Sequence, residues 1–185
     1  QNVAVGANAL DTNTTGEGNT ALGMNTLTAN TTASLNTAIG LDALAVNTTG
    51  ADNVAVGVGA LDSNTTASNN TAVGRAALGA NTTGSRNVAI GEGALDSNTT
   101  ATNNTVIGTY AGDGVTTGIS NILIGYQAGK YANPLITGTE NTIVGSYAYP
   151  SESDTSSANS FGYNLIAVSG YTTIGSAHND IRAAH

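Results

Sequence analysis

The chain has 185 residues and a mass of 18.2 kDa, enough for one ordinary domain. Only 9 % of the residues are charged, and four bases against twelve acids give a net charge of −8. So few bases exclude a nucleic-acid-binding surface, the lack of Cys excludes disulfides and thiolate metal sites, and no apolar run is long enough for membrane insertion.

A five-residue signature recurs along the chain: Asn, any residue, two apolar residues and Gly. A constant 17-residue spacing separates the first eight copies, a ninth follows a three-residue insertion, and Gly162 and Gly175 mark two degenerate copies. The nine copies are NVAVG at 2–6, NTALG at 19–23, NTAIG at 36–40, NVAVG at 53–57, NTAVG at 70–74, NVAIG at 87–91, NTVIG at 104–108, NILIG at 121–125 and NTIVG at 141–145. A polar, Gly-rich composition alone permits disorder, but this register indicates a repeat architecture.

Each repeat is too short for the two helices of a helical repeat, which needs about 33–47 residues. Val, Ile and Thr favour strands, whereas Gly and Asn favour tight corners. We therefore predict an all-β fold, a parallel β-solenoid or β-roll in which each 17-residue coil contains two or three short strands. Stacked coils would lie about 4.8 Å apart.

Three regions follow from the repeat. Residues 1–129 are expected to form regular coils, and 130–175 an irregular continuation that carries insertions and aromatic residues. Residues 176–185 are expected to form a C-terminal junction.

The Asn that opens each signature has two interpretations. Its side chain can hydrogen-bond along a stacked column and close a corner, or the column can bind a metal or other ligand. Neutral amides are poor sole ligands for a hard cation, so we predict a structural ladder and no metal. Its members are Asn2, Asn19, Asn36, Asn53, Asn70, Asn87, Asn104, Asn121 and Asn141.

A second repeated Asn begins the triplet NTT. The triplet is a good corner sequence and is formally also an N-glycosylation acceptor. We favour the corner interpretation and keep glycosylation as the alternative at Asn13, Asn30, Asn47, Asn64, Asn81 and Asn98.

Adjacent strand residues point to opposite faces. Each signature has two apolar residues in succession, such as Ala55 and Val56, so both faces of the strand are apolar. One face can fill the solenoid, which leaves an apolar face exposed or packed against another chain. We therefore expect self-association, as a homotrimer around a common axis.

The aromatic residues all follow residue 109, where insertions break the repeat. Tyr has an apolar ring and a polar tip, and loops on a rigid scaffold often carry recognition. The alternative is that these rings cap the solenoid core. The candidate binding residues are Tyr126, Tyr131, Tyr147, Tyr149 and Tyr163.

No catalytic constellation emerges. Asp11, Asp62 and Asp96 occupy equivalent repeat positions, which fits a corner contact better than catalysis at one site. We expect a protein that is not an enzyme and uses no cofactor.

The motifs NVAVG, NTAIG and NVAIG resemble the repeats of trimeric autotransporter adhesin heads, which are left-handed parallel β-rolls in trimers. Longer units such as 70–86 are more similar to the repeats of bacteriophage tail fibres. The segment 171–185 resembles the stretch that leads into the endosialidase-type intramolecular chaperone of such fibres, which assists trimerisation and is often removed.

The resemblance implies a structural and attachment segment of a phage tail fibre, on the virion or otherwise extracellular, that binds a bacterial cell-surface glycan or protein. One alternative is a bacterial extracellular adhesin or filament subunit. A second is an ice-binding solenoid, which adjacent Thr pairs such as Thr14 and Thr15 suit poorly because neighbours in a strand face opposite ways.

Overall fold

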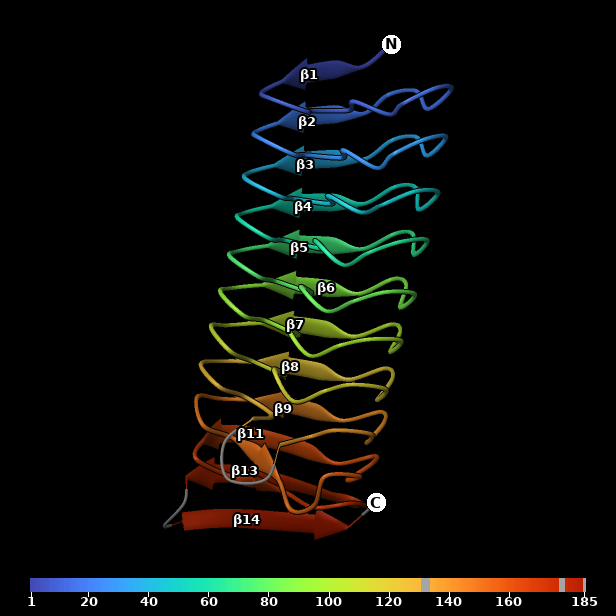
Figure 1. The fold of residues 1–185 in the computed structure, drawn as a ribbon. Coiled ribbons are helices and arrows are strands. Elements are labelled where there is room, and N and C mark those ends of the chain that lie inside the picture. The colour runs from blue at the N-terminus through green and yellow to red at the C-terminus, as the bar shows by residue number, and fades with distance from the viewer. Residues whose placement is uncertain (131–133, 177–178, 185) are drawn as a thin grey trace.

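The computed structural model describes residues 1–130, 134–176 and 179–184 and confirms an all-β parallel solenoid of 17-residue coils. Figure 1 shows the coils stacked along one axis, with the N-terminus at one end and the C-terminus at the other. Within the described ranges, no helix is long and apolar enough to cross a membrane.

Each regular coil contributes one three-residue strand, not the two or three expected, and turns complete the coil. Consecutive strands pair in parallel at an unbroken register, so that Ala55 lies opposite Ala72. The first nine strands are β1 Val3–Val5, β2 Thr20–Leu22, β3 Thr37–Ile39, β4 Val54–Val56, β5 Thr71–Val73, β6 Val88–Ile90, β7 Thr105–Ile107, β8 Ile122–Ile124 and β9 Thr142–Val144.

The C-terminal coils continue this sheet, which ends with an antiparallel strand. Strand β11 (Asn159–Tyr163) pairs in parallel with β9 and with β13 (Tyr171–Ser176), while β10 (Tyr149–Pro150) and β12 (Ile166–Ala167) form a separate parallel pair. Strand β14 (Asn179–Ala184) runs antiparallel to β13, as its reversed arrow in Figure 1 shows. The segment expected to be a junction therefore contains the last strand of the sheet.

The narrow core has two main sources of side chains, and further buried residues such as Ala60, Ala101 and Val115 add to it. The middle residue of each strand points inward and is fully buried from β2 to β9, while the residues on either side of it point outward. The second source is a column of buried Leu residues after the strand, at Leu10, Leu27, Leu44, Leu61, Leu78 and Leu95. These Leu residues have φ between 50° and 54°, and burying each side chain offsets the cost of about 1–2 kcal/mol for that left-handed conformation.

The Gly that ends each signature is required by the close approach of coils. Gly74 has φ +137°, and a Cβ there would lie 2.4 Å from the carbonyl oxygen of Gly91 in the next coil. Any side chain at this position would have to separate the two coils.

Candidate functional site

Two ladders of Asn side chains run through the solenoid. In the first, Asn36 Oδ1 accepts the backbone N–H of Asn53 at 3.0 Å, and Asn36 Nδ2 donates to the carbonyl oxygen of Gly50 at 2.9 Å. The same two bonds recur along the column of signature Asn residues. These bonds hold consecutive coils together. They use the Oδ1 and Nδ2 atoms through which the Asn side chains would otherwise contact a ligand.

The NTT asparagines form the second ladder. Asn47 Nδ2 donates to Asn30 Oδ1 at 3.1 Å and to the Gly50 carbonyl oxygen at 2.9 Å. The ladder ends at Asn98, whose Oδ1 is buried without a partner because Val115 takes the next place in the column. Five of the six are fully buried, at Asn30, Asn47, Asn64, Asn81 and Asn98, whereas Asn13 is half-buried. The folded solenoid has no room for sugars at the five buried positions, and we do not propose glycosylation.

The outward face of the sheet carries no charge from β1 to β13. The first and third residues of β1 to β9 point outward as two columns, the first of Thr, Val and Ile and the second of Val, Leu and Ile. Several of these side chains are strongly exposed, including Val3 and Val5 at 56 % and Leu22 at 46 %. Phe161 in β11 and Ile174 in β13 extend the second column. We call these outward-facing positions the sheet face.

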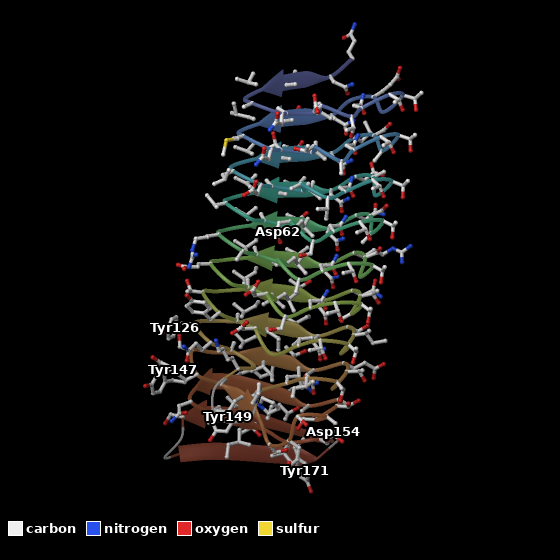
Figure 2. All side chains as sticks on the ribbon, viewed as in Figure 1. Asp62, Tyr126, Tyr147, Tyr149, Asp154 and Tyr171 are labelled. Atoms are coloured by element: carbon white, nitrogen blue, oxygen red, sulfur yellow. The ribbon has the colours of Figure 1, made fainter. Side chains whose placement is uncertain are left out.

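Three of the predicted binding residues come together at one edge of the solenoid. The Tyr126 and Tyr147 ring centroids lie 5.2 Å apart with planes at 79°, and those of Tyr147 and Tyr163 lie 6.0 Å apart at 89°. We call these three residues the tyrosine ladder. Figure 2 shows Tyr126 and Tyr147 side by side on this edge, with Tyr171 near the C-terminal end on the opposite side of the view.

The register of the coils explains the contacts in the tyrosine ladder. Tyr126, Ser146 and Tyr163 each follow the Gly of their coil, so they share one column. Tyr147 stands in the neighbouring column, and its ring fills the space that the small Ser146 leaves between the other two rings. The rings of Tyr126 and Tyr163 are exposed, at 42 % and 60 % for the whole residues.

The other two predicted tyrosines do not join the tyrosine ladder. Tyr149 lies in β10, in the column that the buried Leu residues occupy in earlier coils, and is half-buried. This position fits the alternative in which an aromatic ring covers the end of the core. Tyr131 lies outside the described residues.

The same edge carries a polar network that the sequence analysis missed. Arg75 forms an ion pair with Glu92 at 2.8 Å, which lowers the pKa of the Glu92 carboxyl, and the Tyr110 hydroxyl lies 3.3 Å from that carboxylate. Lys130 lies 4.7 Å from the Tyr110 ring centroid and pairs with Asp113. Each ion pair joins two residues separated by one full period of the repeat, and this spacing is the signal that would have revealed both pairs.

Two acidic side chains meet over a glycine in the column that Asp113 and Lys130 continue. The place of a Cβ on Gly79 lies 2.6 Å from Asp96 Oδ1 and 3.6 Å from Asp62 Oδ1, so both carboxylates lean over that coil. Partial burial raises the pKa of Asp62 and of Asp96, and the neighbouring Asp113 raises that of Asp96 further. Among the described residues, no group of three or more His, Cys, Asp and Glu side chains is placed to hold a metal ion.

These features define a class of protein by its fold: a parallel β-solenoid with an uncharged sheet face and an aromatic edge. No family model, curated protein or solved structure matches the chain.

Proposed function

We propose that this chain is a structural and attachment segment of an extracellular fibre, in which rods associate side by side and one end contacts a bacterial surface. A bacteriophage tail fibre on the virion is the form of this proposal that the repeat resemblance favours. A bacterial extracellular adhesin is the alternative form. In both forms, the segment extends the fibre and binds the bacterial surface, without catalysis.

The observation that carries the proposal is the sheet face. It is uncharged although the chain has a net charge of −8, so copies can approach there without bringing like charges together. Every strand from β1 to β9 contributes one residue to each of the two columns, and Phe161 and Ile174 extend the second column. An interface of standard size uses about 20–30 residues a side, which this face approaches.

A homotrimer is the assembly that we propose for this face. Two columns side by side allow the first column of one copy to meet the second column of the next, and such a contact closes into a ring of three where each copy is rotated by a third of a turn. Covering the exposed aliphatic side chains would also enlarge a core that is thin within each rod.

The oligomer is tested by sedimentation equilibrium, where we expect three times the 18.2 kDa of one chain. Val73→Asp places a charge on the sheet face and should dissociate the oligomer. Thr66→Asp places the same charge on an exposed corner and is the matched control. A wild-type chain that remains a monomer at micromolar concentration would refute self-association.

The attachment step is tested by binding of the fluorescently labelled protein to bacterial cells. We expect saturable binding by the oligomer, and electron micrographs of the native particle should show the rod on a virion. Absence of the rod from virions, together with a membrane anchor elsewhere on the encoded chain, would favour the adhesin form.

A further inference from the structure

We infer that the tyrosine ladder binds an extended, neutral glycan whose chain runs along the solenoid axis and stacks alternate sugar units on Tyr126 and Tyr163. The inference rests on the proposed attachment function and names the ligand class for it.

Spacing is the first argument. Tyr126 and Tyr163 occupy one column two coils apart, which is about 9.6 Å at a coil spacing of about 4.8 Å. In an extended β-1,4-linked glycan, one pyranose unit advances by about one coil spacing, so units one and three of a chain parallel to the axis would meet the two rings. A curved α-linked chain does not keep this alignment.

The rigidity of the rings is the second argument. Tyr147 lies between the other two rings and meets both edge to face, so neither ring can rotate freely. Its backbone N–H also donates to the Tyr126 carbonyl oxygen at 2.9 Å. A platform that is already ordered loses little conformational entropy when a ligand stacks on it.

The chemistry next to the rings also suits a sugar ligand. Pyranose units present apolar C–H faces and a rim of hydroxyl groups, and the exposed tyrosines present apolar rings with polar tips. Gln127 donates to the Tyr126 hydroxyl at 3.2 Å, which leaves that hydroxyl free to donate, and half-buried Ser146 adds a further hydroxyl.

Charge selects a neutral ligand. Residues 121–170 contain three acids, Glu140, Glu152 and Asp154, and a single base, Lys130. Lys130 is engaged by Asp113 and by the Tyr110 ring. An anionic glycan would therefore meet net negative charge and no unengaged cation among the described side chains of these coils.

The test is affinity electrophoresis of the wild-type oligomer through gels that contain one polysaccharide each. Hydroxyethyl cellulose, which is neutral and β-1,4-linked, should retard the protein. Carboxymethyl cellulose keeps the backbone but adds negative charge, and amylose keeps neutrality but changes the linkage, so both should retard it less. Equal retardation by all three would overturn the stated preference, and no retardation by hydroxyethyl cellulose would overturn the inference.

Variants assign the binding to the ladder. Tyr126→Ala and Tyr163→Ala should each weaken the hydroxyethyl cellulose affinity at least about fivefold, given about 1 kcal/mol for a stacked ring. Tyr171→Ala removes a tyrosine of similar exposure, 41 %, away from the ladder and should leave the affinity unchanged. Equal losses in all three variants would contradict the ladder as the site. Circular dichroism and sedimentation check that each variant keeps its fold and oligomer.

Cell binding separates this inference from the proposed function. If wild type and both ladder variants bind cells equally, attachment stands and the ladder inference fails. If wild type binds no cells yet is retarded by hydroxyethyl cellulose, the glycan site stands and the attachment function fails. Loss of cell binding after protease treatment of the cells would identify a protein receptor and would also contradict the inference.

Discussion

Val106 Cγ1 lies over Gly112, 3.4 Å from the place where a Cβ on that glycine would be. In most earlier coils the strand residue equivalent to Val106 is a buried Ala, and the residue equivalent to Gly112, six positions later, is a buried Leu. In the next two coils the large side chain belongs to the strand, and a glycine takes the Leu position. The pairs are Val106 with Gly112 and Leu123 with Gly129. The volume of side chains in the interior stays similar, because a larger strand residue compensates for the glycine in the Leu column.

This exchange predicts strong coupling between the two columns. Ala72→Val alone should cost about 1–3 kcal/mol by overpacking, and Leu78→Gly alone about 2–5 kcal/mol by opening a cavity. The double variant reproduces the arrangement at Val106 and Gly112, so its loss should be at least about 1 kcal/mol smaller than the sum. Urea unfolding of the four proteins in the cycle measures the coupling, and additive losses would refute it.

The signature glycines should be far less replaceable than other glycines with positive φ. Gly74→Ala brings a Cβ to 2.4 Å from a neighbouring carbonyl oxygen, and we expect it to lower the free energy of unfolding by about 3 kcal/mol. Gly59→Ala is the matched control, since Gly59 has φ +66° and its Cβ would meet nothing closer than 3.9 Å. The control should cost about 1 kcal/mol from backbone strain alone. Similar losses at both positions would show that coil contact does not limit substitution.

Removing one amide from the first Asn ladder should unfold the chain at lower denaturant concentration. Asn53→Ala leaves the buried N–H of Asn70 without a partner, and the carbonyl oxygen of Ala67 keeps only its bond from Asn64 Nδ2. At about 1–3 kcal/mol for one buried unpaired group, we expect a loss of about 2 kcal/mol. Thr66→Ala, at an exposed corner, should change stability by less than about 0.5 kcal/mol. An Asn53→Ala loss below about 1 kcal/mol would mean that water enters and replaces the amide.

Asp62 and Asp96 should make the folded chain more stable in mild acid. Burial raises the pKa of both carboxyls, so the folded state binds protons more tightly than the unfolded chain does. Their favourable contribution is complete below the unfolded pKa of about 3.9 and is lost as the pH rises through the raised folded values. The double variant Asp62→Asn with Asp96→Asn should therefore be more stable than wild type at pH 7 and show a flatter dependence between pH 4 and pH 7.

Glu92→Gln gives the control of opposite sign. Arg75 lowers the pKa of Glu92, so this carboxyl stabilises the fold above its unfolded pKa and loses that effect as the pH falls. Its removal should lower stability at pH 7, slightly because the pair is exposed. Denaturant midpoints measured from pH 3.5 to pH 7.5 give the pH dependence of stability for wild type and for each variant. The two variants should change the wild-type slope in opposite directions, and changes in the same direction would contradict this assignment.

Local chemistry made much of the fold predictable. A signature of Asn, apolar residues and Gly at a constant spacing is enough to infer coils, corners and a parallel sheet. The spacing could not show how residues of different coils meet at an edge. The insertion in the eighth coil takes Tyr126 and Ser146 out of the 17-residue period, and only the folded register shows that Tyr147 fills the gap beside Ser146.

The sequence by itself determined the period of the solenoid, because strands of one repeat can stack only in register. The tertiary structure decided which face of each strand is the interior. Ala55 and Val56 are both apolar, so the alternation that usually separates inside from outside is absent. The interior is already filled by the Leu column, so the smaller residue turns inward and the larger one forms the sheet face.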